Sequence, residues 1–175
     1  LALDHNPRYN LVNPWQGAVN AVTEAARNVA ATGASPAALT DCLCFGNPEN
    51  PEHLFAFREA VRGLGDACRA IGLADHPGAP LPIIAGNVSL YNESPRGVIP
   101  PSPMVACLGV LPDASRAVTT DLKAVGSLLV LVATGKPALG GSVYYALHGA
   151  LGADIPKPDL QRIGDEIHGV VEAIQ

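Results

Sequence analysis

Small polar side chains follow two apolar segments, and their types could bind a metal ion through oxygen. Asp41 comes near the end of the predicted strand "AALTDCLCF", and Asn87 directly follows the apolar segment "LPIIAG". Strand ends that face a common crevice are the usual place for ligand groups in open α/β sheets, so we expect Asp41 and Asn87 to lie close enough to share one Mg²⁺. Carboxylate and amide oxygens suit Mg²⁺, which normally shares the phosphate oxygens of a nucleotide, and Gly86 would let the backbone approach that phosphate closely. In the alternative interpretation, which spacing alone favours, Asp41 and Asn87 only cap loops through Asx turns.

Other candidate groups give weaker indications. The loop "GKPALGGS" at 135–142 joins a predicted strand to a helix, so its N–H groups could bind an anion, but a tight turn is the commoner use of such glycines. Cys42 and Cys44 would share one face of a strand, too close in sequence for a sound disulfide, and no second pair completes a zinc site. We expect the cysteines to be small apolar side chains in a reducing compartment. No nucleophile with a base is found, so no catalytic residue is expected in this chain.

Composition excludes several classes of protein. The chain has 175 residues, of which 48% are hydrophobic and 15% charged, with a net charge of −5. This balance is typical of a globular domain and lacks the excess of Lys and Arg that a nucleic-acid surface needs. The longest apolar run, 127–133, is too short to span a bilayer, and no signal peptide is visible. Both ends are expected to fall inside regular elements, so we expect a piece of something longer.

Helices and strands alternate along the chain. Asn13 and Pro14 predict the start of one helix, which Gly33 ends, and Asn50 and Pro51 predict the start of another, which ends at Gly72. The apolar face expected of this second helix consists of Leu54, Phe57, Val61, Leu64, Cys68 and Ile71. Strands are expected at 37–46, 81–86, 104–111 and 127–134. A short helix is expected from Ser142. The apolar face of a last helix is expected to consist of Leu160, Ile163, Ile167, Val170, Val171 and Ile174. The fold class is α/β or α+β in two lobes.

Four stretches together resemble the second half of the phosphoribosylformylglycinamidine synthases. They are "DHNPRY", "AVNAVTEAARNVAATGASPAALTDCLCFGNPENPE", "AGNVSLYNE" and "LGGS", and in order they cover nearly the whole chain. The resemblance implies an aminoimidazole-ribonucleotide-synthetase-like fold, with two lobes of mixed sheets flanked by helices, incomplete at both ends. Residues 1–116 would form the N-terminal-type lobe with the nucleotide and Mg²⁺ site, and residues 117–175 the start of the C-terminal-type lobe.

The resemblance also implies a function. The parent enzyme would be a cytoplasmic, ATP-dependent ligase of de novo purine biosynthesis, converting formylglycinamide ribonucleotide to formylglycinamidine ribonucleotide with ammonia from glutamine. ATP would be a substrate and Mg²⁺ a cofactor. The expected partners are the first half of the same enzyme and a glutaminase subunit or domain, with no nucleic acid and no membrane. Because the family's catalytic His belongs to the first half, we expect this chain alone to be inactive.

Site residues follow from the matching motifs. Asp41, in "TDCL", and Gly86, in "GNVSLYNE", fall on positions that contact the nucleotide; Asn87 falls on a Mg²⁺ ligand and Ser89 on a contact to the ribonucleotide substrate. Two positions depart from the family pattern. Cys44 replaces a usual Asn, and Val143 replaces the Glu of "LGGSEY".

Two alternatives remain open. This half could bind a nucleotide for structural reasons without turning it over, as one of the two pseudo-symmetric sites does in some members of the family. The chain could also belong to another ATP-dependent enzyme of the same superfamily, such as a selenophosphate or thiamine-phosphate kinase-like protein, although those relatives lack "GNVSLYNE".

Overall fold

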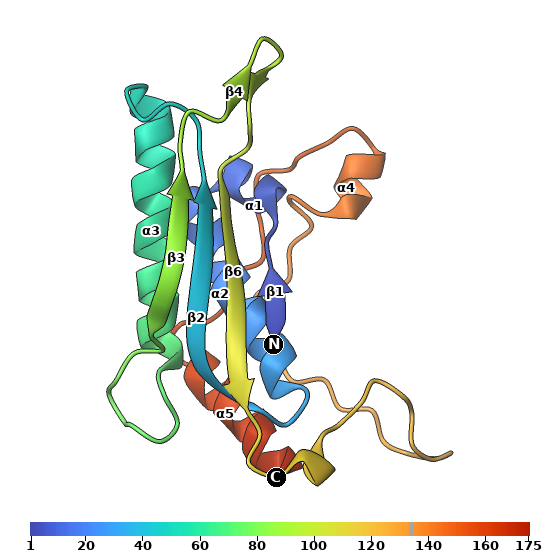
Figure 1. Ribbon diagram of the computed structural model, residues 1–175. Helices are drawn as coiled ribbons and strands as arrows, with labels where there is room; N and C mark the ends of the chain where they lie inside the picture. Colours follow the sequence, from blue (N-terminus) through green and yellow to red (C-terminus); the bar gives the residue numbers. More distant parts are fainter. Residues whose placement is uncertain (134) are drawn as a thin grey trace.

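The computed structural model describes residues 1–133 and 135–175, and its centre is a four-stranded mixed sheet with helices against one face (Figure 1). The elements in chain order are β1 (Ala2–Asp4), α1 (Pro7–Val12), α2 (Pro14–Ala30), β2 (Ser35–Cys44), α3 (Pro51–Ile71), β3 (Ile83–Ser89), β4 (Glu93–Ser94), β5 (Gly97–Val98), β6 (Ser102–Val110), the 3₁₀ turn η1 (Ala114–Arg116), α4 (Val143–Leu147) and α5 (Ile163–Ile174).

The order of strands in the main sheet is β1-β6-β2-β3. Strands β2 and β3 are parallel and are linked through α3, whereas β6 is antiparallel to both β1 and β2. A mixed sheet flanked by helices confirms the predicted fold class. Helix α1 was not foreseen: Asn6 caps it by accepting hydrogen bonds from the N–H groups of Arg8 and Tyr9, so only three residues at the start of the chain form a strand.

Helix α2 lies at the centre of the molecule and is buried along most of its length. As predicted, Asn13 caps it by accepting a hydrogen bond from the N–H of Gln16 at 2.9 Å, and Pro14 occupies its first position. Its small and β-branched side chains are fully enclosed: Ala18, Val19, Ala21, Val22, Ala25, Ala26, Val29 and Ala30. Small residues allow this helix to pack closely against both the sheet and α3.

The buried face of α3 differs from the predicted one. Leu64, Cys68 and Ile71 are buried as expected, but Leu54 and Val61 are 40% and 44% exposed. The buried positions also include smaller residues: Ala56, Ala60, Gly63 and Ala67. The physical reason is close approach to α2, because a Cβ at residue 63 would overlap the backbone carbonyl of Trp15. The predicted face is therefore partly wrong, because it was based on large apolar residues, whereas small residues form the contact with α2.

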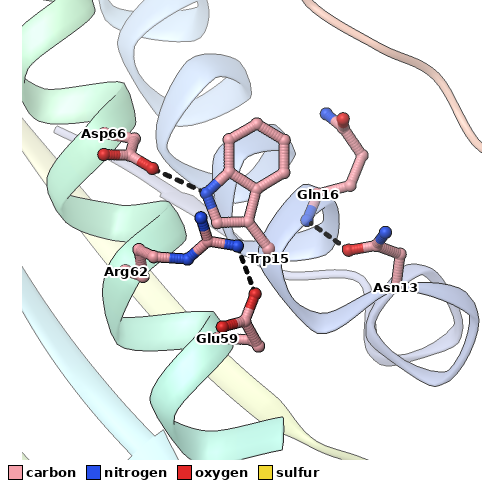
Figure 2. A network of polar contacts seen from close by, with 6 residues as sticks. All are labelled: Asn13, Trp15, Gln16, Glu59, Arg62 and Asp66. Carbon is pink, nitrogen blue, oxygen red and sulfur yellow. Dashed lines mark hydrogen bonds and ion pairs between the residues drawn. The ribbon is translucent and has the colours of Figure 1, made fainter.

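A polar network at the surface joins the start of α2 to the middle of α3 (Figure 2). The indole Nε1 of Trp15 donates a hydrogen bond of 2.7 Å to Asp66, and the Arg62 guanidinium lies 5.6 Å from the centre of the Trp15 ring. Arg62 also pairs with Glu59 one turn earlier on α3. The hydrogen bond from Trp15 is the first cause that holds the pKa of Asp66 below its usual value. The network thus links the two helices at the surface, beside their contact in the core.

No helix covers the other face of the sheet in the part of the chain that the structure describes (Figure 1). Side chains alternate along β2, so Leu39 and Leu43 point into the core while Thr40 is exposed. Apolar residues on this open face are also exposed: Leu3 by 70% and Leu108 by 47%. We refer to this surface, formed by the outward side chains of β1, β6, β2 and β3, as the open face.

The predicted strand at 127–134 is wrong for the described residues 127–133; Thr134 lies outside them. Leu128, Leu129, Val130 and Leu131 are each 81–90% exposed and form no ladder. A strand needs a neighbour for its backbone groups, and no described strand lies beside this segment. Its apolar pattern therefore indicates an unpaired segment and not an element of this sheet.

The last part of the chain returns to the helical layer. Helix α5 packs against α2 and α3, with Ile163, Ile167 and Val171 in the same core, as its periodicity predicts. An ion pair of 2.7 Å joins Arg27 of α2 to Glu166 of α5. Helix α4 begins after Ser142, also as predicted. None of the helices in the described ranges has both the length and the apolar character needed to cross a membrane.

Candidate functional site

The parallel pair of β2 and β3 brings the predicted site residues together. In the register of this pair Asp41 lies beside Gly86, Cys42 beside Asn87, and Cys44 beside Ser89. Strand β3 continues to Ser89, beyond the expected end at residue 86, whereas β2 ends at Cys44, before the expected end at residue 46. Asp41 and Asn87 are therefore ladder residues near the ends of neighbouring strands, and neither caps a loop as the Asx-turn alternative requires.

The Asp41 side chain lies directly over Gly86. A Cβ at residue 86 would overlap the Asp41 carboxylate, so the glycine is needed for this close approach. Asp41 is half-buried, and burial raises the pKa of its carboxyl above the usual value. No hydrogen bond to this carboxylate is found among the residues that the structure describes. A half-buried carboxylate without a partner among the described residues is a candidate for binding a ligand.

Asn87 lies on the open face beside two thiols. The Cys42 thiol donates a hydrogen bond of 3.2 Å to Asn87 Oδ1, and the Cys42 and Cys44 sulfurs are 3.7 Å apart. The two cysteines share one face of β2, as their spacing predicts. Burial is the main cause that raises the pKa of the Cys44 thiol, and the hydrogen bond with Cys42 adds to it. Sequence reasoning missed Cys42 as a partner of Asn87, because the contact depends on strand register.

Asp41 and Asn87 do not point to the same place. Because side chains alternate along a strand, Asp41 shares the core-side face with Gly86, whereas Asn87 shares the open face with Cys42. The prediction that Asp41 and Asn87 are close enough to share one Mg²⁺ is therefore wrong. The error has a simple cause: neighbouring strands were correctly predicted, but a register offset of one residue exchanges the faces.

Ser89 and Asn92 form the turn after β3. The Asn92 side-chain amide donates hydrogen bonds to the backbone carbonyls of Ser89 and Phe45, at 2.8 and 3.0 Å, and the Ser89 hydroxyl bonds with the Asn92 side chain. Tyr91 between them has a positive φ of 59°. Part of the polar cluster in "GNVSLYNE" therefore stabilises its own turn, and Ser89 is placed on the open face two residues beyond Asn87.

The residues on the open face fit Mg²⁺ only in part. Asn87 supplies one amide oxygen, and no cluster of three or more His, Cys, Asp or Glu suited to a metal occurs in residues 1–133 and 135–175. Mg²⁺ keeps several waters and commonly shares phosphate oxygens, so a single protein ligand suits an ion that arrives with a nucleotide. This donor set does not suit a tightly bound, resident ion.

The loop at 135–142 is a packed turn and does not provide an anion site. The N–H groups of Gly140 and Gly141 donate to the carbonyls of Asp154 and Leu151, at 2.8 and 2.7 Å. Gly141 has a φ of 70°, and a Cβ there would overlap the Tyr9 ring. These N–H groups already donate hydrogen bonds within the chain, so the tight-turn interpretation is confirmed.

A second group of carboxylates lies between β1 and α2 and was not singled out from the sequence. Burial first, and then the charge and hydrogen bond of Glu24, raise the pKa of Asp4 to about 7. The same two carboxylates, after burial, raise the pKa of Tyr9. The sequence separation of Asp4 and Glu24 gave no signal of this contact.

Comparison with known proteins gives a consistent picture. The family model described as "AIR synthase related protein, N-terminal domain" matches residues 1–111. The chain is 50% identical over 175 residues to phosphoribosylformylglycinamidine synthase subunit PurL of Methanothrix thermoacetophila, covering 99% of this chain and 23% of that protein. The subunit PurL of an Anaeromyxobacter species is 44% identical over 163 residues, with 93% and 20% covered. The predicted resemblance is confirmed.

Solved structures agree. The structure of PurLQS from Thermotoga maritima matches with a TM-score of 0.56 and 28% identity, over 68% of this chain and 18% of that chain. PurL of T. maritima complexed with ATP matches with a TM-score of 0.51 and 29% identity, over 61% and 17%. The chain thus spans about a quarter or less of the length of these relatives.

Proposed function

Because the chain belongs to the family of AIR synthase related proteins through their N-terminal domain, we propose that it is part of an ATP-dependent carbon–nitrogen ligase of purine biosynthesis. The ligase converts formylglycinamide ribonucleotide to formylglycinamidine ribonucleotide with ammonia from glutamine. The observation that carries the proposal is 50% identity over 175 residues to a PurL subunit. Since the chain covers 23% of that relative, the activity is assigned to a longer polypeptide that contains it.

Asp41 and Gly86 bind ATP in this proposal. Two features support the assignment. The Asp41 carboxylate lacks a partner among the described residues, and Gly86 has no side chain that would cover the backbone beside it. The carboxylate can accept hydrogen bonds from hydroxyl or amino groups of the nucleotide. A solved relative of this chain was complexed with ATP, which also supports a nucleotide ligand.

Asn87 binds Mg²⁺ and Ser89 binds the ribonucleotide substrate. Both side chains are on the open face, two residues apart, which supports a division of roles along one strand. Because Asn87 faces away from Asp41, the ion at Asn87 would offset phosphate charge on the open face and not beside the Asp41 carboxylate. The Asn87 oxygen positions that ion, and the Ser89 hydroxyl, already close to Asn92, can exchange its weak internal hydrogen bond of 3.2 Å for one to the substrate.

The open face is proposed to pack against the remainder of the same polypeptide. Its exposed leucines, Leu3 and Leu108, support a covering partner, and more than three quarters of the Methanothrix relative lies outside the matched part. A glutaminase subunit or domain supplies ammonia; the relative described as PurLQS is consistent with a multi-component assembly. We further propose a cytoplasmic location and a lobe boundary near residue 116, close to the end of the family match at 111.

Two other functions remain candidates. Among the described residues the side-chain partner of Asn87 is the Cys42 thiol, and no carboxylate or imidazole base hydrogen-bonds it, which favours a structural nucleotide site without turnover. Another ATP-dependent activity of the superfamily is the second candidate.

The test uses the full-length protein with ATP, Mg²⁺ and ammonia. Release of ADP should require formylglycinamide ribonucleotide and yield the amidine in equal amount. ADP release that depends instead on selenide or thiamine phosphate would assign the protein to another branch of the superfamily. A fully active enzyme in which Asp41→Asn abolishes nucleotide binding at this site, with turnover unchanged, would indicate the structural site.

A further inference from the structure

The thiols of Cys42 and Cys44 are not used by the proposed reaction. They project from the same side of β2 onto the open face, and neither is fully buried. Cys68 and Cys107, by contrast, are buried in the core at 4% and 0% exposure. The fold therefore presents a pair of thiols on an accessible face.

The separation of the two sulfurs suits a bridging metal better than a disulfide. The sulfurs are 3.7 Å apart, whereas a disulfide requires about 2.05 Å and would pull two strand side chains together. Two thiolates on a shared three-coordinate ion at about 2.3 Å, with angles of about 120°, are separated by about 4.0 Å, which a small side-chain rotation reaches. The pair already has nearly the spacing of two ligands on one soft ion.

The surrounding donors select the kind of ion. Met104 is the direct cross-strand partner of Cys42 on β6, so its side chain projects from the same face with Cβ atoms about 5 Å apart. Zinc normally takes four nitrogen or sulfur ligands, and no third His, Cys, Asp or Glu joins the pair in the part of the chain that the structure describes. Thiolate and thioether ligands with low coordination number favour monovalent copper.

We propose that Cys42, Cys44 and Met104 form a binding site for monovalent copper on the open face. Binding forms three bonds from copper to sulfur, two to thiolates and one to the Met104 thioether, and releases the two thiol protons to solvent without a change in oxidation state. The Cys42 thiol then no longer donates its hydrogen bond of 3.2 Å to Asn87. The copper ligands are sulfur atoms and include none of the residues assigned to ATP, Mg²⁺ or substrate, although Cys42 contacts Asn87 and Cys44 lies beside Ser89.

The experiment is a competition titration of the reduced, full-length protein under anaerobic conditions, with Cu(I) supplied as its bicinchoninate complex. The parent protein should remove copper from the chelator with one equivalent more than the Cys44→Asn variant. Cys44 is not fully buried, so a polar side chain at this position should leave the fold intact, which circular dichroism checks. Met104→Leu should keep the equivalent but weaken its affinity by about tenfold.

Cys107→Ala is the matched control, because Cys107 lies on the core side of the sheet. This variant should bind as much copper as the parent. X-ray absorption at the copper edge should show sulfur ligands in the parent that decrease in Cys44→Asn. Equal copper uptake by the parent and Cys44→Asn would overturn the proposal, as would an equal loss of copper in Cys107→Ala and Cys44→Asn.

Discussion

The carboxylate of Asp41 occupies the space where a side chain at Gly86 would lie, on the core-side face of the parallel pair β2 and β3. Both residues belong to strands, so neither needs its residue type for a turn. A bare glycine beside a half-buried carboxylate without a described partner indicates a surface shaped for a ligand.

We predict that Gly86→Ala weakens nucleotide binding by about tenfold or more, because the new methyl group displaces the Asp41 carboxylate. The same overlap should lower the free energy of unfolding by about 1–3 kcal/mol. Calorimetric titration of the full-length protein with an ATP analogue measures the first effect, and denaturant unfolding measures the second.

Gly169→Ala is the control for this variant. Gly169 lies in α5 without a positive φ, and a Cβ added there would meet no heavy atom of the described residues within 4 Å. Alanine should therefore stabilise the helix by about 0.5–1 kcal/mol and leave nucleotide binding unchanged. Nucleotide affinity that is equal in Gly86→Ala and Gly169→Ala would argue against a ligand over Gly86.

The helices could be predicted from the sequence with more accuracy than the site. Asn13, Pro14, Asn50 and Pro51 mark helix starts through local hydrogen bonds and a fixed φ, which need no knowledge of distant residues. Which face of α3 is buried depends instead on how closely α2 approaches, and only Gly63 and the neighbouring alanines record that. A prediction from hydrophobic residues alone therefore placed Val61 wrongly on the buried face of α3.

This difference gives a stability prediction. Leu64→Ala should cost about 2–5 kcal/mol of unfolding free energy, because Leu64 is 2% exposed and a cavity would remain. Val61→Ala should cost less than about 1 kcal/mol, since Val61 is 44% exposed. Denaturant melts of the two variants compare these effects directly. Equal losses of unfolding free energy in the two variants would instead support the buried face of α3 that hydrophobic spacing predicts.

A pH dependence is expected from Asp4. Its pKa is raised from 3.8 to about 7 by burial and by Glu24, so between these values the folded state keeps a proton that the unfolded chain has lost. Stability from this group is therefore fully present below pH 4 and is lost as the pH rises through 7. Burial lowers the pKa of the neighbouring His5, which acts in the opposite direction, so the comparison must isolate Asp4.

Asp4→Asn provides that comparison, because asparagine has a similar shape and does not ionise. The unfolding free energy of the variant minus that of the parent should increase from pH 4 to pH 8. A difference that stays constant over this range would show that burial and Glu24 do not raise the pKa of Asp4 as described.

The 175-residue chain by itself should show no synthase activity. It covers 23% of the Methanothrix relative, and its Asn87 and Ser89 lie on an open face that no described helix covers. Purified chain, incubated with formylglycinamide ribonucleotide, ATP, Mg²⁺ and ammonia, should form no amidine above background. Measurable turnover would place the complete active site within these residues.

For the candidate site, the neighbouring strands could be predicted from the sequence, but the face of the sheet on which each side chain lies could not. The sequence indicated that Asp41 and Asn87 lie on neighbouring strands, because each follows an apolar segment. The face on which each side chain lies depends on the register of the two strands. The register shifts by one residue at an irregularity between Leu39 and Thr40, which the residue types there do not predict. The contact of Cys42 with Asn87 was not predictable for the same reason.

The most direct test of a Mg-nucleotide site on these strands is a thermal melt of full-length Asn87→Ala with and without a Mg²⁺–ATP analogue. The parent should gain stability from the ligand, as expected when only the native state binds it. We predict that Asn87→Ala melts at the parent's temperature without ligand and loses most of the gain with it. A variant that keeps the full gain, or that unfolds early as Leu64→Ala does, would contradict a ligand role for Asn87.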